Sequence, residues 1–330
     1  MLWPALCAGF FVAPIRDVEA NTHSIQAPSI HTKIALAGTV VDRQGQPISG
    51  ATVQVLAFGA GAANAGRTAT TDGSGAFELE DLDRRSVLLK VTRAGYYPEI
   101  LPADLHRPAY EASTGVGNLT LTDKKTGRVR LMFVGDTMFG RRFTDEDQDG
   151  QQEAGDLIRS GSRAADAQKV VRYVADALAS ADYSVANLEC TVSAEPGPEH
   201  PYKSYTFYSH PETLAGLTAA GIDGVSLGNN HVFDYLDAGV YDTINAVADL
   251  GLDWTGAEMS ETAARDTVIR RTLSGVPLSL QGFSELRTDG SQLTNYLLVA
   301  LDPAKPGRST PPTTTSTTSS PPRRAGSACR

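Results

Sequence analysis

Three short apolar runs in the middle of the chain each end in polar residues, and this pattern limits the fold more than any other feature. The runs cover residues 131–136, 183–189 and 224–231. Each run is short enough and sufficiently rich in β-branched residues to form a buried strand, and helical patterns lie between the runs. The sequence therefore predicts parallel strands joined by helices, in an α/β sheet.

Apolar periodicity outlines the remaining elements of this part of the chain. Apolar residues at three- and four-residue spacing predict helices near 163–181, 211–220 and 236–251. Further β-rich segments predict strands that extend the sheet near 252–254, 267–273 and 277–283.

The three runs place Asp136, Glu189 and His231 where ligands bind in an open α/β sheet, beyond the carboxyl ends of the strands. Two carboxylates and an imidazole on one rim suit a hard-to-borderline metal ion or acid–base chemistry. Asp234 follows His231 by three residues and could orient the imidazole by accepting its other N–H. Each residue taken alone has a simpler reading, because Asp or Asn at a strand end often caps a helix.

The segments 133–141 (FVGDTMFGR), 186–189 (ANLE) and 227–235 (LGNNHVFDY) resemble the CapA-type poly-gamma-glutamate capsule synthesis proteins. That family looks like a distant relative of the calcineurin-like metallophosphoesterases, and the resemblance covers roughly 129–305. It implies a metallophosphoesterase-like α/β domain that acts on a polyanionic or phosphoester substrate.

The resemblance also implies a set of functional residues. A divalent metal ion at the sheet rim, of unknown identity, would be bound by Asp136, Asn187, Glu189, Asn230 and His231. The implied catalytic residues are Asp136, Glu189, His231 and Asp234. One departure lies beside the motif: Leu236 stands where the family usually has glycine.

An acidic segment between the first two runs resembles a calcium-binding loop. Residues 145–156 fit the pattern Asp-x-Asp-x-Asp-Gly with an acid at the twelfth position, and Gly150 suits the sharp turn at the sixth. The predicted Ca²⁺ ligands are Asp145, Asp147, Asp149, Glu153 and Asp156. Asp156 replaces the usual Glu, which predicts lower affinity. No helix precedes the loop, and a solvated acidic turn is the alternative.

Two arginines, Arg141 and Arg142, lie between the first run and the acidic segment. They could bind an anionic substrate or offset the acidic loop, and the sequence favours the second role.

Residues 34–100 contain short alternating strands with turn signals and no helical stretch, which predicts a small β-sandwich. The segments 38–53 and 70–79 closely resemble carboxypeptidase regulatory-like domains, which implies a folding or spacer module without chemistry of its own. Asp42 and Asp72 are interpreted as turn residues. Residues 101–128 are predicted to be a linker.

The ends of the chain differ in composition from the rest. Residues 1–33 contain an apolar run of signal-peptide length and a polar linker, although a positively charged start is missing and the start itself could be misassigned. With the resemblance, this segment predicts a protein secreted from, or on the surface of, a bacterium, with cell-envelope association. Residues 306–330 are rich in Ser, Thr and Pro and predict a disordered tail. The resemblance implies further strands and a later His-and-Glu motif, so the α/β domain is expected to be truncated.

Charge and cysteine content exclude some classes of protein. The net charge of −9 and the absence of a basic stripe argue against nucleic-acid binding. Three widely spaced cysteines support neither a disulfide framework nor a thiolate metal site. Two functions remain: a CapA-like surface protein with a metal-dependent hydrolase site, and a non-catalytic, calcium-stabilised binding module.

Overall fold

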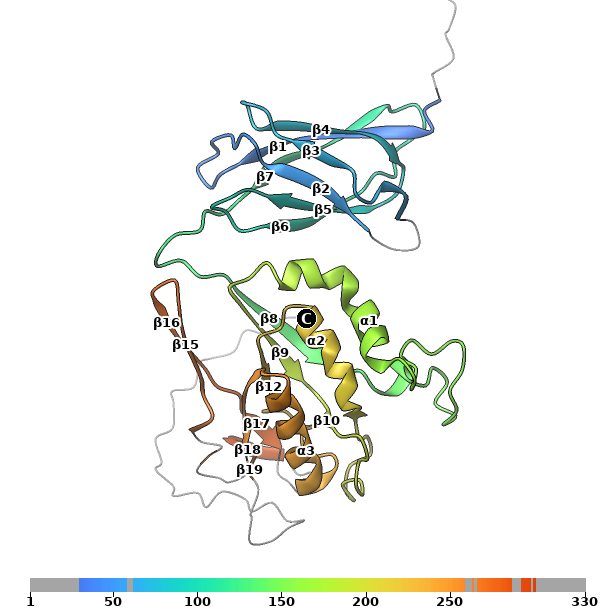
Figure 1. The fold of residues 1–330 in the computed structure, drawn as a ribbon, viewed down its shortest axis with the longest axis vertical. Helices are drawn as coiled ribbons and strands as arrows, with labels where there is room; N and C mark the ends of the chain where they lie inside the picture. The colour runs from blue at the N-terminus through green and yellow to red at the C-terminus, as the bar shows by residue number, and fades with distance from the viewer. Residues whose placement is uncertain are drawn as a thin grey trace, which may run out of the picture.

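The computed structural model describes residues 30–57, 62–258, 263, 266–286, 292–297 and 299–300. The signal-like segment up to residue 29 and the tail at 306–330 lie outside the described residues. A β-rich part precedes a part that contains helices and a parallel sheet (Figure 1).

The β-rich part consists of two sheets that enclose one apolar core. The first has the order β4-β1-β7, formed by β1 (Lys33–Val41), β4 (Ala76–Asp83) and β7 (Ser113–Thr120). The second has the order β3-β2-β5-β6, formed by β2 (Thr52–Leu56), β3 (Thr68–Thr70), β5 (Val87–Thr92) and β6 (Glu99–Ala103). Inward-facing Leu36, Val53 and Leu89 are fully buried between the two sheets.

Both acids that the sequence assigned to turns lie in turns. The Asp42 Oδ1 atom accepts hydrogen bonds from the N–H groups of Gln44 and Gln46, each at 2.8 Å. Asp72 accepts in the same way from the N–H groups of Ser74 and Ala76. Side chains engaged with their own turn need no ligand to explain them.

The predicted linker over residues 101–128 is wrong for much of its length, because β7 belongs to the sandwich. This strand pairs in parallel with β1, from Ala35 opposite Ser113 to Val41 opposite Thr120. Leu121, just beyond it, is fully buried in the sandwich core. The pattern concealed the strand because β7 lies at a sheet edge, where most of its side chains are exposed or half-buried.

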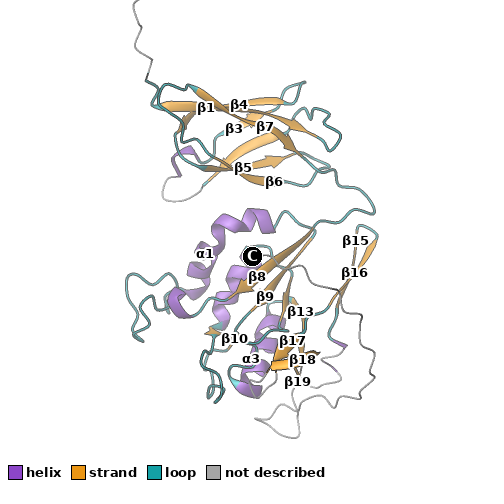
Figure 2. Cartoon of the chain, turned by 180° about the vertical axis from the view of Figure 1, so that it is seen from behind, coloured by secondary structure: helices purple, strands orange, loops and turns teal. Residues whose placement is uncertain are grey.

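The second part is built on a parallel sheet with the order β13-β12-β9-β8. Its strands are β8 (Leu131–Thr137), β9 (Tyr183–Leu188), β12 (Gly224–Ser226) and β13 (Asp253–Thr255). Its helices are α1 (Arg163–Leu178), α2 (Ala215–Ala219) and α3 (Leu236–Asp249). Figure 2 shows α1 and α3 beside this sheet, where buried Ala167, Val225 and Val240 share one core.

Short elements complete the described chain. The 3₁₀ turns are η1 (Ala62–Asn64), η2 (Arg141–Phe143) and η3 (Pro211–Leu214). The two-stranded pairs are β10 (Thr191–Val192) with β11 (Tyr208–Ser209), β14 (Ala257–Glu258) with β19 (Val299–Ala300), β15 (Ile269–Leu273) with β16 (Val276–Leu280), and β17 (Ser284–Leu286) with β18 (Gln292–Leu297).

The strands β15 and β16 do not extend the parallel sheet, contrary to the expectation for residues 267–283. They form an antiparallel hairpin of their own, with Leu273 opposite Val276. The turn residues Ser274 and Gly275 have φ values of +49° and +80°. Positive φ at both turn positions is typical of a tight two-residue hairpin, which fixes local antiparallel pairing.

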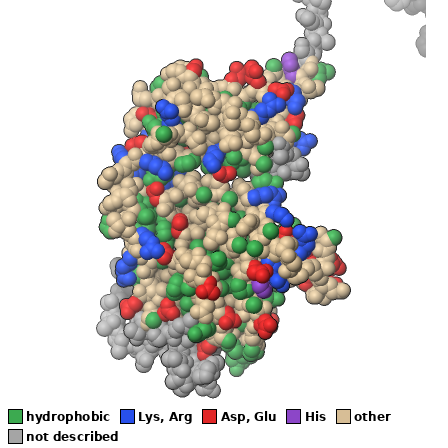
Figure 3. Space-filling model, in the orientation of Figure 1, with side chains coloured by type: hydrophobic (Ala, Val, Ile, Leu, Met, Phe, Trp, Pro, Cys, Tyr) green, Lys and Arg blue, Asp and Glu red, His purple; other side chains and the backbone are tan. Residues whose placement is uncertain are grey.

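The two parts of the chain meet through buried and half-buried polar contacts. The Arg130 guanidinium donates to the Pro98 carbonyl oxygen at 2.7 Å and pairs with Glu99. It also lies 4.6 Å from the centre of the Tyr97 ring, and the Tyr97 hydroxyl donates to Asp182. Basic and acidic side chains are interspersed over the face drawn in Figure 3. Within the described residues, no helix has the length and apolarity needed to span a bilayer.

The extent of the sandwich can be tested with two fragments. A fragment of residues 30–123 should fold alone and give a dispersed amide NMR spectrum, because it contains both sheets and the buried Leu119 and Leu121. A fragment of residues 30–104 should give a collapsed spectrum, because it lacks the strand beside β1. A well-dispersed spectrum from the shorter fragment would show that β7 is not needed.

Candidate active site

The strands β8 and β9 end side by side and bring two polar side chains into contact. Asp136 lies opposite Asn187 in the parallel register, after an irregularity between Val134 and Asp136. The Asn187 Nδ2 atom donates a hydrogen bond to Asp136 Oδ1 at 2.8 Å. A local bulge of this kind redirects a side chain at a sheet edge, and here it accompanies the acid that ends β8.

The Asn229 side chain connects the loop after β12 to the end of β9. Its oxygen accepts hydrogen bonds from the N–H groups of His231 and Val232, at 2.9 and 3.0 Å. Its nitrogen donates to Asn187 Oδ1 at 3.0 Å and to the Leu188 carbonyl oxygen at 2.8 Å. The resemblance selected the adjacent Asn230, which together with His231 matches the family's Asn-Asn-His.

Asp136 and Glu189 line the same cavity, and their pKa values are shifted in opposite directions. The hydrogen bond from Asn187, and then that with Glu189, holds the pKa of Asp136 below its usual value. Burial, and then the hydrogen bond with Asp136 and its charge, raises the pKa of Glu189. His231 lies close enough to lower the pKa of both acids by its charge. As pH rises, Asp136 therefore ionises first and Glu189 keeps its proton longer.

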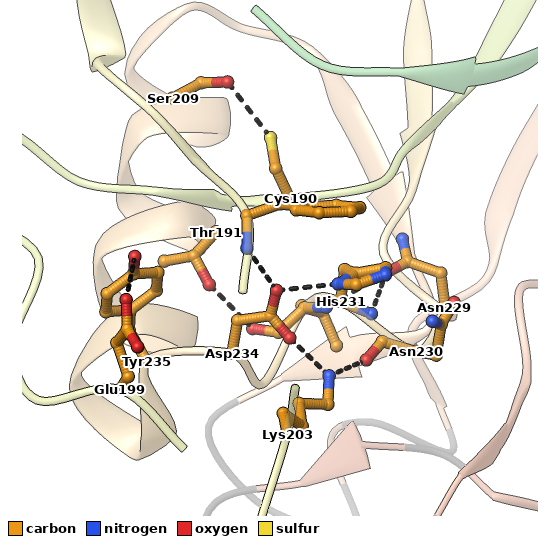
Figure 4. A network of polar contacts seen from close by, with 12 residues as sticks. Cys190, Thr191, Glu199, Lys203, Ser209, Asn229, Asn230, His231, Asp234 and Tyr235 are labelled. Carbon is orange, nitrogen blue, oxygen red and sulfur yellow. Dashed lines mark hydrogen bonds and ion pairs between the residues drawn. The ribbon is translucent and has the colours of Figure 1, made fainter. Parts of the chain in front are cut away.

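His231 is held by a fully buried acid. Its Nδ1 atom lies 2.7 Å from Asp234 Oδ2, and the imidazole is almost completely buried. Figure 4 shows the Asp234 carboxylate between His231 and Lys203. The Lys203 ammonium pairs with Asp234 and also donates to the Asn230 carbonyl oxygen, while the Phe207 N–H donates to Asp234. Sequence reasoning missed Lys203, which lies in an irregular segment without a periodic signal.

Aromatic and apolar side chains lie beside the two acids and the imidazole. The Phe207 ring stacks on His231, with ring centres 3.9 Å apart and an angle of 16° between the planes. A cavity of about 310 Å³ reaches Asp136 and Glu189, and its walls include Phe207 and Met138. Apolar walls keep the dielectric low and so strengthen charge interactions at the carboxyl pair.

Three acids of the predicted calcium loop lie together. Asp145, Asp147 and Asp149 offer ligand oxygens within 4.8 Å of one another. Asp145 also accepts from the N–H groups of Asp149 and Gly150, at 3.2 and 2.9 Å, and Gly150 has a φ of +84°. Figure 1 draws this loop to the right of α1.

The last two predicted calcium ligands do not join that group. The Asp156 oxygens accept from the N–H groups of Glu146 and Glu153, at 2.9 and 2.7 Å, and the residue is buried. The Asp156 side chain therefore closes the loop by accepting two backbone N–H groups. Glu153 lies near enough for Asp147 and then Asp149 to raise its pKa.

The rim residues fit a metal ion only in part. Two carboxyl groups line one cavity, and a proton or a cation would offset the repulsion between their charges. Across the described ranges, however, the only three acidic, His or Cys ligand atoms that lie within 4.8 Å of one another are those of the acidic loop. His231 would have to approach the two acids to complete a three-residue set.

Comparisons with known proteins assign both parts of the chain to families. Residues 130–315 match the family described as bacterial capsule synthesis protein PGA_cap, and residues 35–131 match the carboxypeptidase regulatory-like domain. The capsule biosynthesis protein CapA of Bacillus anthracis is 25% identical over 173 residues, which cover 52% of this chain and 38% of that protein. A probable polyglutamine synthesis accessory protein of Mycobacterium tuberculosis is 33% identical over 88 residues, which cover 27% of this chain and 23% of that protein.

The chain thus spans well under half the length of these curated relatives. Among solved structures, the Bacillus anthracis TIE protein is 17% identical with a TM-score of 0.24, covering 33% of this chain and 19% of its own. A hydroxyquinol 1,2-dioxygenase of Pseudomonas putida is 11% identical with a TM-score of 0.24, covering 30% of this chain and 59% of its own. Likeness at this level carries no argument about function.

The carboxyl pair can be tested by titration. Asp136→Asn should lower the pKa of Glu189, because it removes a neighbouring charge, yet the value should stay raised, because burial is the larger cause. The measurement is the carboxyl ¹³C shift of Glu189 against pH, with a chelator present. In the wild type, the raised pKa favours the folded state below the ordinary glutamate value, and this stabilisation is lost as pH rises through the folded-state pKa. An unchanged pKa in the variant would show that the two acids are not in contact.

Proposed function

The chain belongs to the bacterial capsule synthesis protein family, and we propose that it acts in poly-gamma-glutamate or capsule synthesis through a metal-dependent site. The site would be of the metallophosphoesterase type, in an α/β domain, and would act on a phosphoester or polyanionic substrate. Its N-terminal part is a carboxypeptidase regulatory-like domain. We place the protein outside the cell or on the cell surface of a bacterium, where a capsule is assembled.

One observation carries the catalytic part of this proposal: Asp136 and Glu189 line one cavity at the sheet edge, near enough for each to shift the pKa of the other. Neighbouring carboxyl groups resist ionising together without a compensating charge. A divalent cation would supply that charge, and both carboxylates and imidazole are suitable ligands. Asp136, Glu189 and His231 would hold the ion, which when bound polarises an ester or activates a water molecule.

The neighbouring residues have supporting roles in this proposal. Asn187 holds Asp136 through its amide nitrogen and, with Asn230, is a candidate for a further oxygen ligand. Asp234 engages His231 Nδ1, which leaves Nε2 as the nitrogen available to a metal or a substrate. Lys203 keeps the Asp234 carboxylate paired, so the imidazole is fixed in orientation before any ligand arrives.

Metal binding at the rim can be measured by Mn²⁺ titration calorimetry. Asp136→Asn and Glu189→Gln should each weaken Mn²⁺ binding at this site by about tenfold or more, since each removes one charged ligand. Asp249→Asn, at the exposed end of α3, removes one carboxylate elsewhere and should leave the binding heat unchanged. Equal loss in all three variants would attribute the effect to net charge and contradict the proposed site.

Hydrolysis gives a second measurement on the same variants. With Mn²⁺ present, the wild type should hydrolyse an activated phosphodiester, and both rim variants should lose most of this activity. Activity that survives in both rim variants would contradict the catalytic role of the pair.

The alternative function is a calcium-stabilised binding module without catalysis. The grouping of Asp145, Asp147 and Asp149 favours it, because oxygen ligands at positions 1, 3 and 5 are those that a calcium loop uses. With Asp156 turned to the backbone, we propose that the loop binds Ca²⁺ with a Kd on the order of 0.1–1 mM, as extracellular calcium modules do.

Calcium binding predicts a thermal shift. Millimolar Ca²⁺ should raise the unfolding temperature of the wild type, and Asp145→Asn combined with Asp149→Asn should abolish this rise. Glu189→Gln, which alters only the rim, should retain it. A wild type that is unaffected by 5–10 mM Ca²⁺ would leave the loop as an acidic turn.

A further inference from the structure

A second cavity lies between the acidic loop and the segment around residues 199–208. It measures about 440 Å³, and basic and hydroxyl side chains contribute much of its lining. The basic and hydroxyl groups are those of Arg141, Arg163, Thr144, Ser160, Thr206 and Tyr208. Neither family resemblance nor the proposed metal site assigns a role to this cavity.

Arg141 contacts the acidic loop through an amide and not through a carboxylate. Its guanidinium donates to the amide oxygen of Gln148 at 3.2 Å, and within the described residues it forms no ion pair with a carboxylate. It lies 5.0 Å from the centre of the Phe207 ring and 5.9 Å from that of Tyr205. The hydrogen bond to Gln148 uses one of the five N–H donors of the Arg141 guanidinium, so the guanidinium retains donors for an anion.

The backbone around Arg141 is constrained. Arg141 has a φ of +52°, which is unusual for a residue other than glycine. At the preceding Gly140, an added Cβ atom would lie 1.9 Å from the Tyr208 carbonyl oxygen, so only glycine lets these two segments pass this closely. A strained residue that the surrounding structure holds in place is a frequent feature of ligand sites.

Arg163 provides the second guanidinium. It begins α1, where the positive end of a sixteen-residue helix adds to its charge. It donates to the Ser160 carbonyl oxygen at 3.0 Å and forms an ion pair at 3.7 Å with the exposed Glu212 carboxylate, which lies outside the cavity lining.

The cavity also contains two acids, Asp145 and Glu199. Asp145 accepts two backbone N–H groups, and Glu199 is near the Tyr235 hydroxyl at 3.4 Å. Two guanidiniums against two carboxylates leave the lining close to neutral. A singly charged carboxylate therefore suits it better than a phosphate dianion, which would face both acids.

This cavity and the one at the rim share a wall. Thr206 and Tyr208 line the second cavity, whereas Phe207 lines the cavity that reaches Asp136 and Glu189. Phe207 also stacks on His231, and Arg141 lies over Phe207. A ligand held by Arg141 would therefore lie one side chain away from the proposed metal site.

We propose that this second cavity binds a carboxylate group of an acidic ligand, held by the guanidiniums of Arg141 and Arg163. The inference extends the proposed function, because it gives the substrate of the rim site a carboxylate that is bound beside the reacting group. Arginine suits this role since its planar fork donates two parallel hydrogen bonds to a carboxylate.

The test is an NMR titration of the full chain with glutarate, in the presence of a chelator so that no metal ion mediates binding. The Nε–H signals of Arg141 and Arg163 should shift with glutarate, and inorganic phosphate should bind more weakly. Arg141→Gln and Arg163→Gln should each weaken glutarate binding by about tenfold or more, because each removes a charge-assisted pair of hydrogen bonds.

Arg142→Gln is the matched control, because it removes the same charge from the next residue, which does not line the cavity. It should bind glutarate like the wild type, and far-UV circular dichroism should show that all variants are folded. Equal weakening in Arg142→Gln, tighter binding of phosphate than of glutarate, or absence of glutarate binding by the wild type would overturn the proposal.

Two cross-measurements separate this proposal from the metal site. Glu189→Gln should still bind glutarate, and Arg141→Gln should still bind Mn²⁺. Loss of Mn²⁺ binding by the wild type with intact glutarate binding would contradict the proposed function alone. Intact Mn²⁺ binding without glutarate binding would contradict the carboxylate cavity alone.

Discussion

The site depends on the hydrogen bonds that join the ends of β8, β9 and β12. Parallel strands place their carboxyl ends at one edge, but the loops beyond them are irregular and need their own restraints. Asn229 supplies one, because its buried amide contacts backbone on its own loop and on β9. Asn187 supplies the next restraint, because its side chain accepts a hydrogen bond from Asn229 and donates one to Asp136. Loss of the Asn229 amide would leave buried backbone groups unpaired, which is costly.

The same edge gives its two acids different surroundings, so that only one of them ionises readily. Asp136 is exposed and receives a hydrogen bond, so it ionises readily, whereas Glu189 is more enclosed and holds a proton longer. The buried ion pair of Lys203 with Asp234 fixes His231 on the other side. Differences in burial therefore give chemically similar groups different pKa values, as they do in many acid–base sites.

The sequence predicted those features that follow from regular periodicity. Strand alternation and parallel connectivity were enough to bring Asp136 and Glu189 to one edge, and the spacing of the acidic loop was enough to group Asp145 with its two neighbours. The parts that escaped prediction depend on contacts between distant segments. β7 is an edge strand with little apolar signal, and Lys203 becomes significant only because its loop folds over Asp234.

The central claim is that Asp136 and Glu189, with His231, hold a divalent cation at the sheet edge. Anomalous X-ray diffraction from crystals of the full chain grown with Mn²⁺ tests this most directly. The account predicts a Mn²⁺ peak about 2.0–2.3 Å from oxygens of both Asp136 and Glu189, with His231 moved into contact with the ion. A peak confined to Asp145, Asp147 and Asp149, with none at Asp136 and Glu189, would contradict it.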